Sequence, residues 1–221
     1  MSDMFFLIKN GIVLGYRGYD TAITIPAGTA RIGDNAFQNH PIIQEVIIPE
    51  GVNRIGFNAF KNCRKLTSIT IPESVTVIVG RAFKGCRALS SVMIPNSVNK
   101  IDSSAFKRCD SLTRATIVND TVEIETDAFD ASTTIYCYRG STAEAWAQEN
   151  GNKIVYLDAD AIDLDALNVL YLPANLTTVD AEAFAGLACD AVVVPEGCRS
   201  IGARAFAGCK NLIYVYIPST V

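Results

Sequence analysis

The chain has 221 residues, of which 49% are hydrophobic and 19% charged, and its formal net charge is −4 at pH 7. This is the composition of a globular protein, and no basic stretch is dense enough to follow a phosphate backbone, which argues against nucleic acid as a partner. No apolar run approaches the ~18 residues that a membrane span requires, and the first residues lack the pattern of a signal peptide. The chain is therefore either cytosolic or separated from its leader.

Residues 4–16 predict a β-hairpin at the N-terminus. Two apolar runs, FFLIK and IVLGY, flank the dipeptide Asn10-Gly11. Asn-Gly between apolar runs is the strongest short-range signal of a hairpin, because both residues accept the positive φ of a tight turn. The hairpin precedes a series of repeats, and we interpret it as their N-terminal cap.

One pattern then recurs about every 23 residues. The dipeptide Ala-Phe marks each copy, with its phenylalanine at Phe37, Phe60, Phe83, Phe106, Phe129, Phe184 and Phe206. Ile-Pro or a close variant lies between these marks, for example at Ile71-Pro72. A fixed period of this length predicts a solenoid, in which each coil packs only on its neighbours.

A single coil reads I-G-x-x-A-F-x-x-C-x-x-L-x-x-I-x-I-P-x-x-V-x-x-I, as in residues 55–78. The apolar alternation that ends residues 66–71 predicts a half-buried strand, and residues 75–78 predict a shorter second strand. The spacing of the apolar residues in 59–66 predicts a short helical turn. The fold class is therefore a β-rich α/β solenoid of about 23-residue coils, in which stacking supplies the core that one coil lacks.

A helical lid is predicted where the fifth repeat shortens. A strand over residues 134–138 leads into GSTAEAWAQENG, in which Ser141 is placed to cap the N-terminus of a helix and Gly151 its C-terminus. Together with a strand at 153–157, this helix closes a first block that we assign to residues 1–157.

The second block, residues 158–221, begins at an acidic junction formed by Asp158, Asp160, Asp163 and Asp165. A calcium loop is one reading, but the spacing lacks the glycine and the distal glutamate of an EF-hand, so a solvated linker is favoured. The repeats restart at Leu167 and stop in mid-repeat after Pro218. We expect either a longer chain or a partner at this open C-terminal coil, and self-association is one way to cover it.

These repeats resemble the BspA-like leucine-rich repeat family of bacterial surface proteins. The repeated coil pattern, the opening NGIVLGYRG and the ending GSTAEAWAQENG carry the resemblance, which covers nearly the whole chain outside the acidic junction. It implies a curved solenoid that is secreted, displayed at the cell surface and used in adhesion to host proteins and other cells. It transfers no catalytic residues. Departures such as Val118 in place of the proline imply local irregularity only.

Cysteine and histidine give little sign of chemistry. Cys63, Cys86, Cys109 and Cys209 share one position of the repeat. We expect free buried thiols there, although stacked coils would place them close enough for disulfides, and no short Cys-x-x-Cys pair suggests a metal site. His40 takes the same position one coil before Cys63, and a His-Cys nucleophile is a weaker alternative to a buried ladder substitution. We predict no cofactor, no metal and no enzymatic activity.

Partner binding is expected on the outward positions of the longer strands. These positions carry an unusual share of tyrosine, which supplies contact area at low entropic cost. Ordinary cross-strand packing between exposed side chains explains the same residues equally well. The candidate partner-binding residues are Tyr171, Val193, Tyr214, Tyr216, Tyr136, Met93 and Arg114.

The favoured function is therefore a non-catalytic binding or adhesion module at the cell surface that recognises a protein or glycan. A structural spacer that carries another domain is the alternative. An enzyme ranks third, since the sequence contains no phosphate loop, nucleophile elbow or zinc motif.

Overall fold

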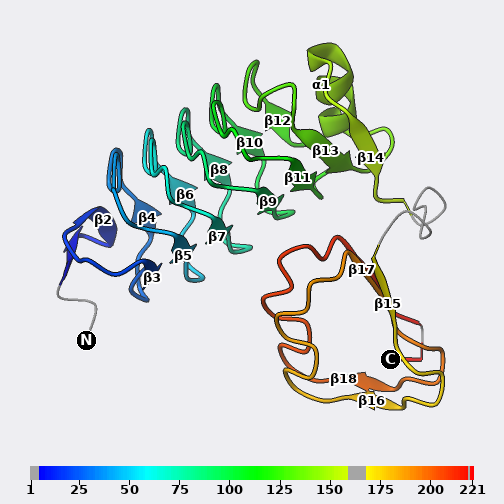
Figure 1. Ribbon diagram of the computed structural model, residues 1–221. Coiled ribbons are helices and arrows are strands. Elements are labelled where there is room, and N and C mark those ends of the chain that lie inside the picture. Colours follow the sequence, from blue (N-terminus) through cyan, green and yellow to red (C-terminus); the bar gives the residue numbers. More distant parts are fainter. Residues whose placement is uncertain (1–4, 159–167, 219) are drawn as a thin grey trace. The chain divides into compact units, whose positions relative to one another are not determined.

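A computed structural model describes residues 5–158, 168–218 and 220–221 (Figure 1). The chain divides into two compact units, residues 1–156 and 157–221. Three of the junction aspartates, Asp160, Asp163 and Asp165, lie outside the described residues, as does Leu167.

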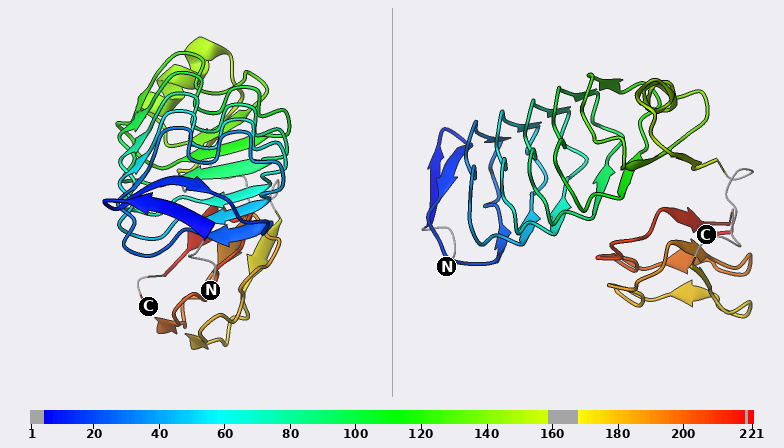
Figure 2. Two further views of the ribbon diagram at one scale, coloured as in Figure 1. Left: turned by 90° about the vertical axis from the view of Figure 1, so that its left-hand side faces the viewer. Right: turned by 45° about the horizontal axis from the view of Figure 1, so that its top comes forward.

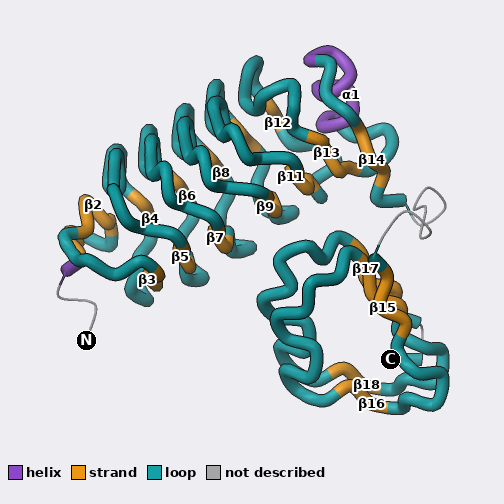
Figure 3. The backbone as a smooth tube through the Cα atoms, viewed as in Figure 1, coloured by secondary structure: helices purple, strands orange, loops and turns teal. Residues whose placement is uncertain are grey.

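The first unit is a β-solenoid with strands on two sides of each coil. One side is a seven-stranded sheet in the order β1 (Phe6–Lys9), β2 (Ile12–Tyr16), β4 (Arg31–Ile32), β6 (Arg54–Ile55), β8 (Val77–Ile78), β10 (Lys100–Ile101) and β12 (Glu123–Ile124). The other side holds β3 (Ala22–Thr24), β5 (Glu45–Ile47) and β7 (Ser68–Thr70), and then β9 (Ser91–Ile94), β11 (Arg114–Ile117), β13 (Thr134–Cys137) and β14 (Ile154–Tyr156). Short strands joined by long turns dominate each coil (Figure 3). The predicted solenoid is confirmed.

A column of phenylalanine rings forms the centre of the first unit. Consecutive rings from Phe37 to Phe129 are stacked with centroids 4.7, 5.2, 4.9 and 4.9 Å apart. Stacking of this kind follows from the repeat, because the backbone N–H of each of the first four phenylalanines also donates to an alanine carbonyl of the next coil, as from Phe60 to Ala82 at 2.7 Å. The core is thus built between coils and not within one.

The two ends of this column are closed as the sequence predicts (Figure 2). At the N-terminal end, β1 and β2 form the expected antiparallel hairpin, with positive φ at Asn10 and Gly11. At the other end lies α1 (Thr142–Asn150), whose N-cap Ser141 accepts a hydrogen bond from the Glu144 backbone and whose C-cap Gly151 is left-handed. Trp146 of this helix packs edge-on against Phe129, at 5.8 Å.

The predicted helical turn is wrong in its local conformation. Residues 56–66 form successive tight turns with bonds between residues i and i+3, such as Cys63 N–H to the Phe60 carbonyl at 3.1 Å. A helix cannot form there because Asn58 and Asn62 adopt φ of 54° and 59°. The same two positions are left-handed in the other coils, at Asn35, Arg81, Ser104, Asp127, Glu182 and Arg204, and at Asn39, Gly85, Arg108, Gly186 and Gly208.

The cysteines form the expected ladder of buried thiols. Cys63, Cys86 and Cys109 each donate from Sγ to the phenylalanine carbonyl of the preceding coil, at 3.0, 3.1 and 3.2 Å. All seven cysteines of the chain are free. Among the described residues, no group of three or more His, Cys, Asp and Glu side chains is placed to hold a metal ion.

The second unit is a shorter solenoid with its own small core. Its sheets are β15 (Val169–Tyr171), β17 (Ala191–Val193) and β19 (Tyr214–Tyr216), and β16 (Thr178–Val179) with β18 (Ser200–Ile201). Phe184 and Phe206 stack at 5.8 Å and both remain half-buried. None of the helices in the described ranges is long and apolar enough to cross a membrane.

Candidate binding surfaces

The outward positions of the longer strands line up in register within each of the two sheets that these strands form in the first unit. Thr24, Ile47 and Thr70 form one row. Along the second group of strands, Met93 is paired with Thr116, which is paired with Tyr136. Because parallel pairing without a register slip keeps equivalent residues on one face, each row displays the variable position of its repeats.

One cluster on this face brings together three of the sequence-predicted residues. The Arg114 guanidinium lies over the ring of Tyr136, 4.8 Å from its centroid, a cation–π arrangement that holds both side chains in place. Met93 is 43% exposed beside them, while Thr116 between the larger side chains is only 2% exposed. We call Met93, Arg114, Thr116 and Tyr136 the Arg114 patch. It offers an aromatic edge, a flexible thioether and one positive charge.

The remaining predicted residues lie in the second unit. Tyr171, Val193 and Tyr216 are in register on one face, and Tyr171 is 62% exposed. Tyr214 belongs to the adjacent row, where it is paired with the buried Ala191 on the neighbouring strand, and it is half-buried. The Tyr216 hydroxyl donates to Glu196 Oε1 at 2.6 Å, and this hydrogen bond raises the pKa of the phenol. We call Tyr171, Val193, Tyr214 and Tyr216 the tyrosine patch.

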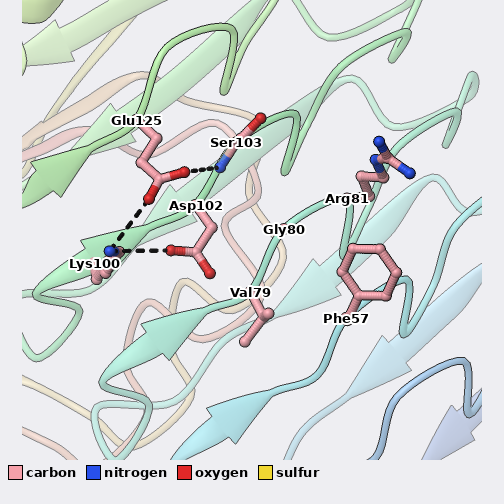
Figure 4. A pocket seen from close by; sticks show the side chains of 8 residues that line it. All are labelled: Phe57, Val79, Gly80, Arg81, Lys100, Asp102, Ser103 and Glu125. Carbon is pink, nitrogen blue, oxygen red and sulfur yellow. Dashed lines mark hydrogen bonds and ion pairs between the residues drawn. The ribbon is translucent and has the colours of Figure 1, made fainter.

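A groove on the other side of the first unit was not anticipated from the sequence. It lies where β6, β8, β10 and β12 run into their turns, has a volume of about 460 Å³, and is lined by Phe57, Val79, Gly80, Arg81, Lys100, Asp102, Ser103 and Glu125 (Figure 4). The Phe57 ring stands at one side of the groove, with the Arg81 guanidinium 5.7 Å from its centroid. The charged side chains of β10 and its turn stand at the other side.

Lys100 is the centre of an ionic network at that second side. Its ammonium lies 3.2 Å from Glu123 Oε1, 3.2 Å from Glu125 Oε1 and 3.5 Å from Asp102 Oδ1. The hydrogen bonds with Glu123 and Glu125 raise the pKa of Lys100. The pKa of Glu125 is lowered, first by the hydrogen bond from the Ser103 N–H and then by Lys100. Lys100 and Glu125 are therefore both charged at neutral pH.

The geometry does not support the His-Cys nucleophile. The Cys63 thiol donates to the Phe37 carbonyl at 3.0 Å, and burial raises its pKa to about 12, the opposite of the change that activates a thiolate. The His40 ring packs at a tilt against Tyr16, with ring centroids 5.6 Å apart, and burial lowers the pKa of His40. Cys63 is part of the buried core, whereas His40 is half-buried at the N-terminal end of the column.

Comparison with known proteins identifies the repeat. The family model described as "BspA type Leucine rich repeat region" matches six copies, within residues 19–136 and 157–221. No curated protein sequence matches the chain.

Three crystal structures of bacterial leucine-rich repeat proteins are similar to this chain, and the first of them shows the same fold. A leucine-rich repeat protein of T. pallidum is 22% identical with a TM-score of 0.57, over 96% of this chain and 89% of that one. A leucine rich cell surface protein of Faecalibacterium prausnitzii is 25% identical with a TM-score of 0.47, over 97% and 74% of the two chains. A protein from Bacteroides ovatus is 27% identical with a TM-score of 0.46, over 98% and 51%.

Proposed function

The chain belongs to the BspA-type leucine-rich repeat family, and we propose that it is a non-catalytic module of the cell surface that binds a protein or glycan partner. The proposed contact is the outward strand face of the solenoid, through the Arg114 patch and the tyrosine patch. Surface location and adhesion rest on the family, in which such repeats are typical of surface proteins.

One observation carries the proposal. Tyr171 is 62% exposed and Tyr216 is 39% exposed in register on one sheet, although neither ring is needed to fill the core. Exposed tyrosines on a rigid sheet bind partners efficiently, because they bury a large area and lose little side-chain entropy. The hydrogen bond to Glu196 holds the Tyr216 ring in one orientation before any partner arrives.

The Arg114 patch supports the same reading in the first unit. Arginine and tyrosine are among the residue types enriched in interface hot spots, and here the Arg114 guanidinium already lies 4.8 Å from the centroid of the Tyr136 ring. The adjacent thioether of Met93 adapts to surfaces of different shape. We propose that each of the two units carries its own contact surface.

The test is a binding screen of the full chain against immobilised extracellular-matrix proteins and a glycan array. We expect the double variant Tyr171→Ala/Tyr216→Ala to weaken at least one interaction more than tenfold. The matched control is Tyr19→Ala, because Tyr19 is 88% exposed and lies outside the strand face. Equal binding of both variants and the unmodified chain, with Arg114→Ala/Tyr136→Ala also unaffected, would show that the strand face is not the contact surface.

A spacer is the second candidate function, favoured by the unbroken ring column. Stacked rings from Phe37 to Phe129, continued by Trp146, make the first unit a rigid rod of coils. A pure spacer predicts that no array member binds and that all surface variants behave alike.

We also propose self-association through the last coil of the second unit. Strand β19 lies at the edge of its sheet, Val215 is half-buried and Ile217 is 54% exposed. Light scattering should show a concentration-dependent dimer that Ile217→Asp abolishes. Leu187→Asp is the control, since Leu187 is 40% exposed in the same unit. A monomer at all concentrations contradicts this proposal.

A further inference from the structure

We propose that the groove beside Phe57 is a binding site for an uncharged saccharide. The groove is formed by the turns after β6, β8, β10 and β12, not by the outward strand face, so this site is independent of the function proposed above.

The other repeats serve as an internal reference for Phe57. The third residue before each recurring phenylalanine is small or polar everywhere else, namely Asp34, Gly80, Ser103, Thr126, Ala181 and Ala203. The coil therefore does not need an aromatic ring at this position. Phe57 is 38% exposed, which means that the ring leaves much of its apolar area in water. Phe57 is not an isolated exposed side chain but part of the lining of the groove, and its departure from the repeat at that place indicates a binding role.

The next coil leaves room beside that ring. Gly80 occupies the position equivalent to Phe57 in the next coil. A Cβ added at Gly80 would lie 3.7 Å from Phe57 Cδ2 and 3.3 Å from the Ser103 carbonyl oxygen. Any larger side chain at residue 80 would thus project into the space between the ring and the charged wall. Val79 adds an apolar surface to the lining. The volume of about 460 Å³ falls within the ~300–1,000 Å³ of small-molecule sites.

The lining has the mixed chemistry that a sugar ring requires. A pyranose has apolar C–H faces that pack on an aromatic ring, and hydroxyls at its edge that both donate and accept. Phe57 supplies the ring at one side of the groove. Across from it, the carboxylates of Asp102 and Glu125 accept from hydroxyls, and the Arg81 guanidinium, which lies beside the ring, donates to them.

Charge balance favours an uncharged ligand. The lining residues include two cations, Arg81 and Lys100, and two carboxylates, Asp102 and Glu125, so that their formal charges sum to zero. An anionic ligand would meet these carboxylates and Glu123, which all surround Lys100. A cationic ligand would compete with Lys100 for the same oxygens and face Arg81. Hydroxyl groups bind here without breaking the ion pairs.

The experiment measures binding of defined probes to the full chain by isothermal titration calorimetry and saturation-transfer NMR. The neutral probes are cellohexaose, maltohexaose, mannohexaose and xylohexaose. The charged probes are sialyllactose, a heparin hexasaccharide and hexalysine. Phe57→Ala tests the ring, and Phe57→Tyr keeps it. Ile47→Ala is the matched control, because Ile47 is 44% exposed on the outward face.

We expect at least one neutral probe to bind, with a tenfold or greater loss of affinity in Phe57→Ala. Affinity should stay within about twofold in Phe57→Tyr, in Ile47→Ala and in Tyr171→Ala/Tyr216→Ala. The last variant separates this site from the strand face, because it alters the proposed function alone. Three results would each overturn the proposal. No neutral probe binds, or only the heparin fragment or hexalysine binds, or a neutral probe binds Phe57→Ala as tightly as it binds the unmodified chain.

Discussion

Replacement of Phe83 by alanine tests the idea that the stacked ring column holds the first unit together. The side chain is fully buried, and its ring lies 5.2 Å from Phe60 and 4.9 Å from Phe106. Loss of a buried phenylalanine costs about 3–5 kcal/mol, including the cavity that is left, and the two lost ring contacts place Phe83→Ala near the upper end. A loss of about 4–5 kcal/mol lowers Tm by about 8–20 °C in a domain of this size.

Urea unfolding followed by the fluorescence of Trp146 measures this loss, because the only tryptophan of the chain lies at the end of the column. Phe57→Ala is the matched control. It removes the same atoms from a ring that is 38% exposed, so we expect about 1 kcal/mol or less. A loss below about 2 kcal/mol for Phe83→Ala, or equal losses for both variants, would refute the view that stability resides in the column.

Four further predictions follow from local geometry. Ser141→Ala should lower the free energy of unfolding by about 1 kcal/mol in a urea titration, since it removes the N-cap of α1; no change would contradict that role. Asn62→Ala should lower the Tm of the protein while Asn62→Gly should not, because φ is 59° at this residue; a lower Tm for Asn62→Gly than for Asn62→Ala in thermal melts would contradict this. Cys86 should resist alkylation at pH 8 until urea unfolds the chain, because burial raises its pKa, and fast native labelling would count against it. Burial raises the pKa of Asp127, but hydrogen bonds from Ser104 and Ser103 outweigh it and lower the pKa overall. This stabilisation is present above the ordinary pKa of about 4 and is lost as pH falls through the lowered value, so Asp127→Asn should reduce Tm more at pH 7 than at pH 2.

The repeat period made much of the fold predictable. Stacking in register follows from spacing, so the ring column and both caps could be placed from residues such as Phe83, Ser141 and Gly151. The turn conformation could not be placed in the same way. Apolar spacing alone does not distinguish a helix from successive turns whose N–H groups bond to the next coil. The recurrence of Asn and Gly at residues 39, 62 and 85 was the available signal.

The candidate sites were predictable only in part. Alternation along each strand identified Met93 and Tyr171 as outward, and both are well exposed. It could not show that Thr116 is only 2% exposed, because alternation marks the face of a residue and not how far the side chains around it cover it. The groove is built from residues of several coils, which lie about 23 residues apart in the chain. Comparison of the residues at the equivalent position of every repeat, which singles out Phe57, was the available signal.

The hydrogen bonds between coils of the first unit have a mechanical consequence. Consecutive coils are joined by hydrogen bonds such as that from the Phe60 N–H to the Ala82 carbonyl. A tension applied along the axis of the unit therefore loads these junctions in series. The weakest junction breaks first, while the others remain intact. Each 23-residue coil that peels away releases about 75–80 Å of extended chain. A molecule of this design lengthens stepwise under pull and limits the peak force that reaches whatever it is tethered to.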